Sequence, residues 1–453
     1  MFTRPRLALL ASVFLIVVVA TAVDGRQLLA LVRRAVFRTN ALAALVQQAS
    51  VQDQGTDRQV TALQQRVQAR PDDQRALSAL GSAYLQKARE TGDPSYYTRA
   101  EQALQKALTL QPDDVDTLNA LGVLALARHQ FREGKRLGEQ AWALNSYRAF
   151  TLGVLGDAEV ELGEYEAAVQ TFQQMVDLRP DLSSYARVSY IRELYGDVPG
   201  AMDAMRRAVN AGGPTTENVA WTQTQLALLY FNAGNLPAAE TELRNVLALH
   251  TGYVPALAGL GRVYAARGQW DDAILLLRQA VDVMPMPEYV ILLGDVYTAA
   301  GRPDDAATQY ALVRAIQQLH RANGVELDME SALFDADHDH DLPDALARAR
   351  SAYAQRPSIH AADVLAWTLY QSGQAAEAQP FMQAALRLGT RDALLHYHAG
   401  MIALANGDRA EAQRQLAAAL DINPYFSLLY SGQARTTLEQ LRTVTTAEGR
   451  SGS

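Results

Sequence analysis

The sequence contains no cysteine, which excludes a disulfide framework, a thiol nucleophile, an iron–sulfur cluster and a cysteine-ligated zinc site. It also lacks an excess of basic residues, because 41 Lys plus Arg stand against 49 Asp plus Glu, a formal net charge of −8. Nucleic-acid binding needs clustered basic side chains, so we expect no nucleic-acid partner. The motifs G-x-S-x-G, H-E-x-x-H and G-x-x-x-x-G-K-[ST] are absent too. We therefore expect no enzyme activity and no cofactor.

The first 23 residues predict a targeting segment. Arg4 and Arg6 precede an apolar run of 17 residues from Leu7 to Val23, at the lower limit of the roughly 17–25 residues that cross a bilayer. An Ala20-x-Ala22 pattern favours a cleaved signal peptide, whereas the arginines after the run favour a retained membrane anchor. Both alternatives predict an exported protein that is periplasmic, on the cell surface or extracellular, or that is tethered to the inner membrane through residues 7–23.

Residues 24–56 combine a basic amphipathic helix with a polar linker. Leu28, Val32 and Val36 lie on one helical stripe, and Arg33 and Arg34 lie off it. Such a helix can rest on an anionic membrane surface or pack its stripe on the structure that follows. We favour packing, because stacked arrays need end caps.

A 34-residue period runs through most of the chain. Pro112, Ser146 and Pro180 close successive similar segments at this spacing. Within each segment a large and a small residue are followed by Gly and, five residues later, by Ala, as at Gly163 and Ala168. Small residues let two helices cross closely, Gly suits the left-handed end of the first helix, and Pro stops the second. The pattern predicts short helical hairpins that must stack to bury their apolar faces.

This pattern resembles the tetratricopeptide repeat (TPR) family. The predicted fold is all-α: a right-handed TPR superhelical solenoid of about ten helix-turn-helix repeats over Pro71 to Pro424, preceded by the signal or anchor segment. We predict an N-terminal array over 57–325, a C-terminal array over 326–424, and a capping helix with a disordered tail over 425–453. The first helices of the repeats are expected to start near Gln74, Val115, Ala149, Leu182, Ala220, Val254, Pro287, Glu326, Ile359 and Ala393.

The resemblance implies that the first helix of each repeat lines a concave groove and contacts the ligand. Its groove-facing positions hold nine acidic and two basic residues, together with several aromatic ones. Such a groove suits a protein or peptide partner with a basic or aromatic segment, although acidic faces are commonly only solvated. The expected partner-binding residues are Asp116, Asp157, Tyr190, Glu193, Trp221, Phe231, Asp295, Glu330, Phe334, Asp363, Trp367, Tyr370 and Tyr397.

The run Asp335–Asp341 is the most polar stretch of the chain. Its carboxylates imitate the start of a calcium-binding loop, but His340 stands where Gly is needed and Leu346 where a bidentate Glu is needed. We therefore expect no metal site here, and Asp341 or Asp344 can instead cap the following helix.

The expected function is that of a protein-binding scaffold or adaptor in the cell envelope or outside the cell. The alternative is a structural subunit of a homo-oligomer or filament, which would require self-association.

Overall fold

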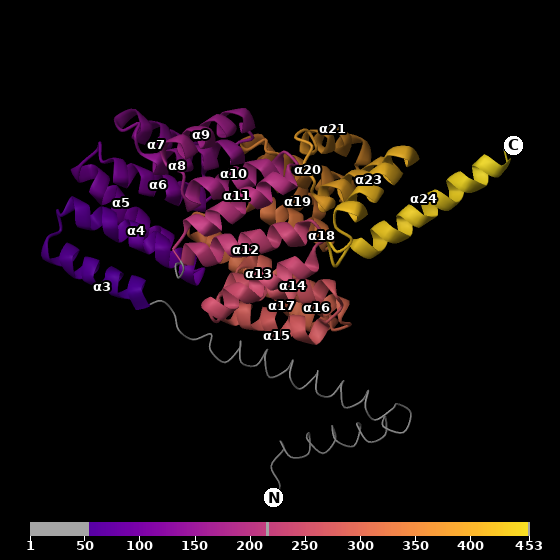
Figure 1. Ribbon diagram of the computed structural model, residues 1–453, viewed down its shortest axis with the longest axis horizontal. Helices are drawn as coiled ribbons and strands as arrows, with labels where there is room; N and C mark the ends of the chain where they lie inside the picture. Colours follow the sequence, from indigo (N-terminus) through magenta and orange to yellow (C-terminus); the bar gives the residue numbers. More distant parts are fainter. Residues whose placement is uncertain (1–53, 214–216, 452–453) are drawn as a thin grey trace, which may run out of the picture. The chain divides into compact units, whose positions relative to one another are not determined.

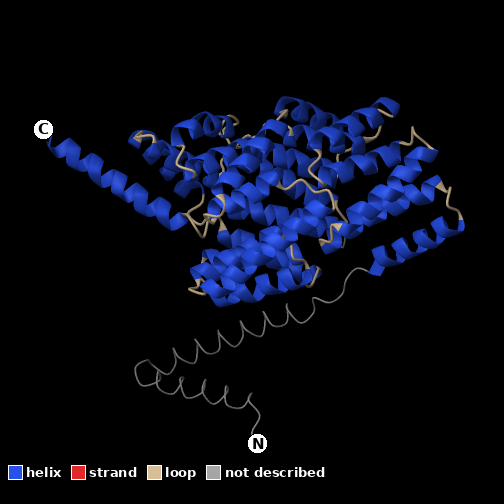
Figure 2. Cartoon of the chain, turned by 180° about the vertical axis from the view of Figure 1, so that it is seen from behind, coloured by secondary structure: helices blue, strands red, loops and turns tan. Residues whose placement is uncertain are grey.

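The computed structural model describes residues 54–213 and 217–451, which form 22 helices and no strand (Figure 1). Figure 2 shows these helices joined by short loops. The described residues belong to one compact unit, Gln52–Ser453. The targeting segment 1–23 and nearly all of 24–56 lie outside the described residues. None of the described helices combines the length and hydrophobicity needed to span a bilayer.

The helices are α3 (Gln54–Ala69), α4 (Gln74–Thr91), α5 (Ser95–Leu110), α6 (Val115–Ala127), α7 (Phe131–Leu144), α8 (Ala149–Glu161), α9 (Tyr165–Leu178), α10 (Leu182–Leu194), α11 (Val198–Ala211), α12 (Glu217–Asn232), α13 (Leu236–Leu249), α14 (Val254–Ala266), α15 (Trp270–Val283), α16 (Pro287–Ala299), α17 (Pro303–Ala322), α18 (Asp328–Asp337), α19 (Leu342–Gln355), α20 (Ile359–Gln371), α21 (Ala375–Ala385), α22 (Ala393–Ala405), α23 (Arg409–Ile422) and α24 (Ser431–Ser451).

Ten helical hairpins run from α4–α5, the first repeat, to α22–α23, the tenth. Each even-numbered helix from α4 to α22 is the first helix of a repeat. Eight of these ten helices begin at the predicted residue, while α12 begins at Glu217 instead of Ala220 and α18 at Asp328 instead of Glu326. The predicted all-α solenoid of about ten repeats is confirmed.

Local chemistry accounts for the helix ends and for the close crossings. The carboxylates of Asp73 and Asp114 accept hydrogen bonds from backbone amides in the first turns of α4 and α6. Gly163 ends its helix with φ 76°, a left-handed conformation that favours glycine. A Cβ added to Gly156 would lie 2.2 Å from the ring of Phe172, so only glycine permits this crossing.

The first helices lie on the inner side of the solenoid. First helices of neighbouring repeats, such as α6 and α8 or α20 and α22, pack against one another in addition to packing on their own second helices. Second helices of neighbouring repeats pack together less closely. The array therefore curves with the first helices inside, and we call the surface that they present there the inner surface.

The internal turns of the first five repeats, each between the two helices of one repeat, touch loops that lie about six repeats further along the chain. The Ile359 amide donates to the Tyr165 hydroxyl at 2.8 Å, across 194 residues. The Glu326 amide donates to the Arg128 carbonyl at 3.0 Å, and the Asn423 side-chain amide to the Phe231 carbonyl at 2.9 Å. We call these contacts the inter-turn seam. It shows that the solenoid completes one turn in about six repeats and that its second turn rests on its first.

The seam also contains two contacts at glycine. Gly92 lies beside the side chains of Met284 and Met286, and Gly196 lies against the backbone of Gly389. Each of the first five repeats thus contributes its internal turn to the seam, and each partner is the loop that precedes the helix α16, α18, α20, α22 or α24.

Packing between consecutive helices is weakest between α17 and α18. The helix α17 is extended, because it has 20 residues where most helices of the array have 13 or 14. The loop between α17 and α18 contacts the first turn of the solenoid, where the Glu326 amide bonds the Arg128 carbonyl. The division into arrays at 325 and 326 stays a prediction.

Candidate functional site

A pocket on the inner surface lies between the two turns of the solenoid and has a volume of about 380 Å³. We call it the inner pocket. The first turn contributes the lining residues from Leu126 to Tyr190, and the second turn contributes those from Met329 to His360. Its lining consists of Leu126, His129, Phe131, Asp157, Val160, Glu161, Tyr190, Met329, Glu330, Arg356 and His360.

The acidic residues expected in the groove mostly have a cationic partner within the chain. Asp157 accepts two hydrogen bonds from Arg187, at 2.8 and 2.6 Å. Asp116 pairs with Arg148. Glu330 pairs with Arg356 at 3.1 Å. These arginines lie outside the groove positions that the repeat register counts, so the count overstated the negative charge.

Two inner carboxylates are less completely compensated. Glu161 lies 3.6 Å from Arg356, and Glu193 accepts a hydrogen bond of 3.2 Å from the neutral amide of Asn232. Burial raises the pKa of Glu161, although Arg356 opposes this shift, and burial also raises the pKa of Glu193. A cationic group from outside would stabilise their ionised forms.

Tyr190 and Trp221 present aromatic surface to solvent, with 37% and 40% of their areas exposed. The surrounding protein nevertheless raises the pKa of Tyr190 well above its ordinary value, through desolvation first and then through Glu161. Exposure to water and strong desolvation coexist where a side chain lines a narrow space with protein on several sides. Such a space is present here, because Tyr190 lines the inner pocket.

Five of the expected partner-binding side chains are buried, so the expectation that they face a groove needs correction. Trp367 and Tyr397 pack with Tyr430, which the segment before α24 brings over them. Asp363 accepts a hydrogen bond from His398 beneath Trp367. Phe231 is covered by the Arg262 guanidinium, and Phe334 packs against Tyr310 and His338. The buried set is Phe231, Phe334, Asp363, Trp367 and Tyr397, and the half-buried Tyr370 stacks on Trp367.

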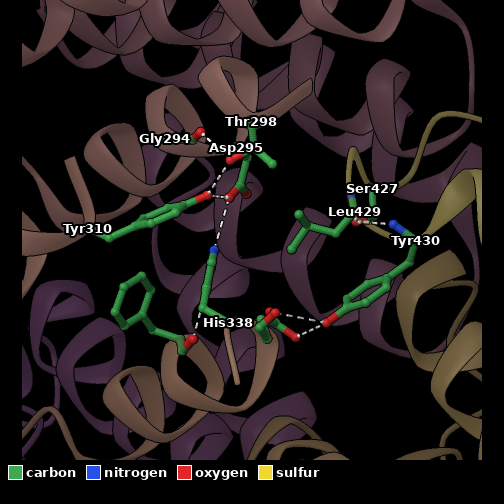
Figure 3. Close-up of polar contacts among 10 residues, drawn as sticks. Gly294, Asp295, Thr298, Tyr310, His338, Ser427, Leu429 and Tyr430 are labelled. Carbon is green, nitrogen blue, oxygen red and sulfur yellow. Dashed lines mark hydrogen bonds and ion pairs between the residues drawn. The ribbon is translucent and has the colours of Figure 1, made fainter. Parts of the chain in front are cut away.

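The polar run 335–341 makes intramolecular contacts (Figure 3). Asp337 accepts hydrogen bonds of 2.8 Å from both the Trp367 indole and the Tyr430 hydroxyl. Asp341 accepts from the Asp344 amide and caps α19, as expected. Within the described residues no group of three or more acidic or histidine side chains is arranged to hold a metal ion.

His338 connects the end of α18 to α16, next to the junction of α17 and α18, where packing between consecutive helices is weakest. Its Nε2 lies 3.0 Å from the Asp295 carboxylate, which also accepts from the Tyr310 hydroxyl at 2.9 Å (Figure 3). Its Nδ1 lies 2.7 Å from the Phe334 carbonyl oxygen. Burial lowers the pKa of His338, but the hydrogen bond and charge of Asp295, the Phe334 carbonyl and the charge of Asp337 together outweigh burial and raise it. Two acceptors on one ring favour the imidazolium form, which donates to both.

Family models described as tetratricopeptide repeat match residues 151–182 and 230–294. The chain is a tetratricopeptide repeat protein. The TPR fold is consistent with a protein-interaction scaffold, and TPR scaffolds are typically not enzymes. Whether this chain is of the exported bacterial type stays a prediction.

One curated relative of this TPR protein is "Cellulose synthase 1 operon protein C" of Komagataeibacter xylinus, 27% identical over 214 residues. The match covers 43% of this chain and 16% of the relative, so the chain spans only a small part of that protein. Among solved structures, Cut9 with Hcn1 is similar at 13% identity and a TM-score of 0.37, over 89% of this chain and 96% of that chain. The pilus biogenesis factor PilW is similar at 18% identity and a TM-score of 0.37, over 44% of this chain and 92% of that chain.

Sequence reasoning missed several lining residues of this TPR protein's site. His129 from the first turn, and Arg356 and His360 from the second, occupy positions outside the expected set, yet all three line the inner pocket. His129 carried one local signal in the sequence, since it stands at the turn position where most repeats have glycine, and in the structure it holds φ 61° there. Nothing local signals that Arg356 lies near Glu161, because the two are brought together by a full turn of the solenoid.

Proposed function

We propose that this TPR protein is a scaffold that holds a partner protein by an extended segment on its inner surface. The observation that carries the proposal is an exposed aromatic ring, Tyr190, with two incompletely compensated carboxylates: Glu161, which lines the inner pocket together with Tyr190, and Glu193, which follows Tyr190 by three residues on α10. Trp221 extends the aromatic surface on α12, two repeats beyond α8.

The chemistry favours a partner segment that carries basic and aromatic residues. A Lys or Arg side chain can pair with Glu161 or Glu193 and lie over the ring of Tyr190. An aromatic side chain can pack on Trp221. A volume of about 380 Å³ accommodates side chains of an extended segment and not a folded domain. Because the repeats are rigid, most of the conformational freedom that is lost on binding is lost by the partner segment.

We further propose that the scaffold acts in the cell envelope or outside the cell, exported or tethered through residues 7–23. The support is the sequence itself: an apolar run between Arg6 and Asp24 with small residues before Val23. Expressing the full-length chain with a C-terminal reporter enzyme that is active only after export tests this location. Reporter activity equal to that of a chain without residues 1–23 would contradict it.

Binding can be tested with panels of short extended peptides, one rich in Lys, Arg, Trp and Tyr and one in which Asp and Glu replace the basic residues. We expect the basic panel to bind more tightly, and higher ionic strength to weaken its binding because exposed charges are screened. Fluorescence anisotropy with labelled peptides measures both effects. Equal affinity for the two panels would contradict the role of the carboxylates.

Variants of the chain locate the binding surface. We expect Tyr190→Ala combined with Glu193→Gln to weaken binding of the basic peptides about tenfold or more, as truncation of interface anchors commonly does. Tyr147→Ala is the matched control, because this tyrosine is 84% exposed and lies in the loop before α8, away from the pocket lining. If the control weakens binding as much as the double variant does, the inner pocket is not the site.

A further inference from the structure

The inter-turn seam shows that this chain can join two of its own turns edge to edge. On one side stand the internal turns of repeats one to five, and on the other stand the loops that precede α16, α18, α20, α22 and α24. The contacts include close backbone approaches, as at Gly163 and Gly196, and hydrogen bonds in which at least one of the two groups belongs to the backbone, as with Tyr165 and Asn423. Further internal turns and further loops of these two kinds occur at the two ends of the array.

One end presents internal turns that nothing in the described residues covers. A Cβ added to Gly301, Gly373 or Gly407 would meet no atom within 4 Å, whereas one added to Gly163 or Gly196 would meet backbone at 2.6 or 2.4 Å. All five glycines occupy the same turn position, with φ between 72° and 84°. The turn of the eighth repeat has no glycine, and its residues Asp339 and His340 are exposed. We call the turns of repeats seven to ten the free turns.

The other end presents loops that are equivalent to those in the seam. They precede α6, α8 and α10 and comprise residues 111–114, 145–148 and 179–181, and we call them the free loops. The last residues of the helices before them, Leu110, Leu144 and Leu178, are large and exposed. Of the equivalent residues in the seam, Ile422 is buried and Val283 is 39% exposed.

Asn145 in a free loop repeats the arrangement that Asn423 has in the seam. Asn423 ends α23, its Oδ1 accepts from the Tyr425 amide at 2.9 Å, and its amide donates to the Phe231 carbonyl of the other turn. Asn145 ends α7, and its Oδ1 accepts from the Tyr147 amide at 3.0 Å. Within the described residues the Asn145 amide group has no acceptor, so it is placed to make the contact that Asn423 makes.

We propose that a second copy of this chain binds here, with its free loops on the free turns of the first copy. The contact continues the inter-turn seam from one molecule into the next. Because the two edges differ, the interface is head-to-tail and leaves a free edge at each end, so it propagates into a linear assembly.

The repeat count sets the register between the copies. α24 follows the tenth repeat as a lone first helix, and α3 precedes the first repeat as a lone second helix. Together α24 of one copy and α3 of the next take one repeat position. Counting from the eighth repeat, the sixth position onward is the third repeat of the next copy, because repeats nine and ten, the shared position and repeats one and two come between. The internal turn of the eighth repeat, at Asp339, therefore meets the loop before the third repeat of the next copy, at Ser146.

Cross-linking tests the register, because the chain has no native cysteine. Full-length Ser146→Cys and Asp339→Cys chains are purified in mild detergent, mixed, and oxidised. We expect the mixture to form disulfide-linked dimers at least several times faster than either chain alone. Lys106→Cys, an exposed position on the second helix of repeat one, replaces one partner as the control. Equal rates in all mixtures, or faster linking of identical chains, would overturn the proposal.

Sedimentation velocity over rising concentration gives a second measurement. Asn145→Asp keeps the oxygen that accepts from the Tyr147 amide but replaces the donor group with a charge that would face a carbonyl oxygen. We expect this variant to shift assembly to about tenfold higher concentration, as loss of a hydrogen-bonded contact does, while Tyr190→Ala assembles as the wild type does. The proposed assembly would be refuted by a wild-type chain that stays monomeric at every concentration, or by an Asn145→Asp chain that assembles at the same concentration as the wild type.

Discussion

Replacing Gly196 with alanine would separate the strain of a single turn from the contact between two turns of the solenoid. Gly196 has φ 74°, and an added Cβ would lie 2.4 Å from the Gly389 carbonyl oxygen. Gly373 occupies the equivalent turn of a later repeat with φ 76°, and an added Cβ there meets no atom within 4 Å of the described structure. The two substitutions therefore impose the same local strain, and only one of them disturbs the seam.

The expected magnitudes follow from these geometries. An alanine held in the left-handed conformation lowers the free energy of unfolding by about 1–2 kcal/mol, and we expect only this loss for Gly373→Ala. Gly196→Ala also forces two backbone segments apart, and overpacking of this kind adds about 1–3 kcal/mol. We therefore expect a total loss of about 2–5 kcal/mol for Gly196→Ala, with the excess over Gly373→Ala reporting on the seam.

The assay is urea unfolding of the two variants and the wild type, followed by circular dichroism. Repeat arrays can unfold in steps, so the midpoints and slopes are compared before any free energy is extracted. Hydrogen exchange of the amides near Gly389 gives a local measurement, which should quicken in Gly196→Ala and stay unchanged in Gly373→Ala. Equal losses of stability with equal exchange would refute the reasoning, because they would show that the two turns do not touch.

Two further predictions concern the polar and aromatic contacts of the second turn. Trp367→Ala should lower stability by about 3–5 kcal/mol, since the ring is buried and its N–H bonds Asp337; thermal unfolding measures this, and an unchanged melting temperature would contradict the assigned packing. Burial raises the pKa of Asp337, and the pKa of His338 is raised against burial by Asp295 and its other acceptors. Each group therefore gives stability that is complete below its ordinary pKa and is lost as pH rises through its folded pKa. For His338 the urea midpoint should therefore fall as pH rises above about 6.5, and His338→Asn should flatten that fall; an equal slope in the variant would show that His338 does not cause it.

Sequence pattern was sufficient for the helices and their pairing, because both depend on contacts within about one repeat. Gly156 illustrates this: a small residue at a fixed distance from Phe172 predicts a close crossing, and the crossing is present. Glycine at position 163 predicts a left-handed helix end for the same local reason, and the turn has that conformation.

The candidate site was only partly predictable. Tyr190 and Glu193 do lie on the inner surface, but Trp367 and Tyr397, chosen by the same register, are buried. They are covered by Tyr430, which belongs to the C-terminal segment and to no repeat. The register describes which way a residue points on its own helix, and it says nothing of what else comes to lie there.

By itself the sequence determined that short helices recur in pairs and that each pair must stack on its neighbours. Only the tertiary structure decided that a second turn rests on the first, that Gly163 lies against Pro357 as well as ending a helix, and that Arg356 comes near Glu161. The physical reason is that contacts six repeats apart depend on the small rotation added at each repeat. That rotation is shared among all the packed side chains and is carried by no single motif.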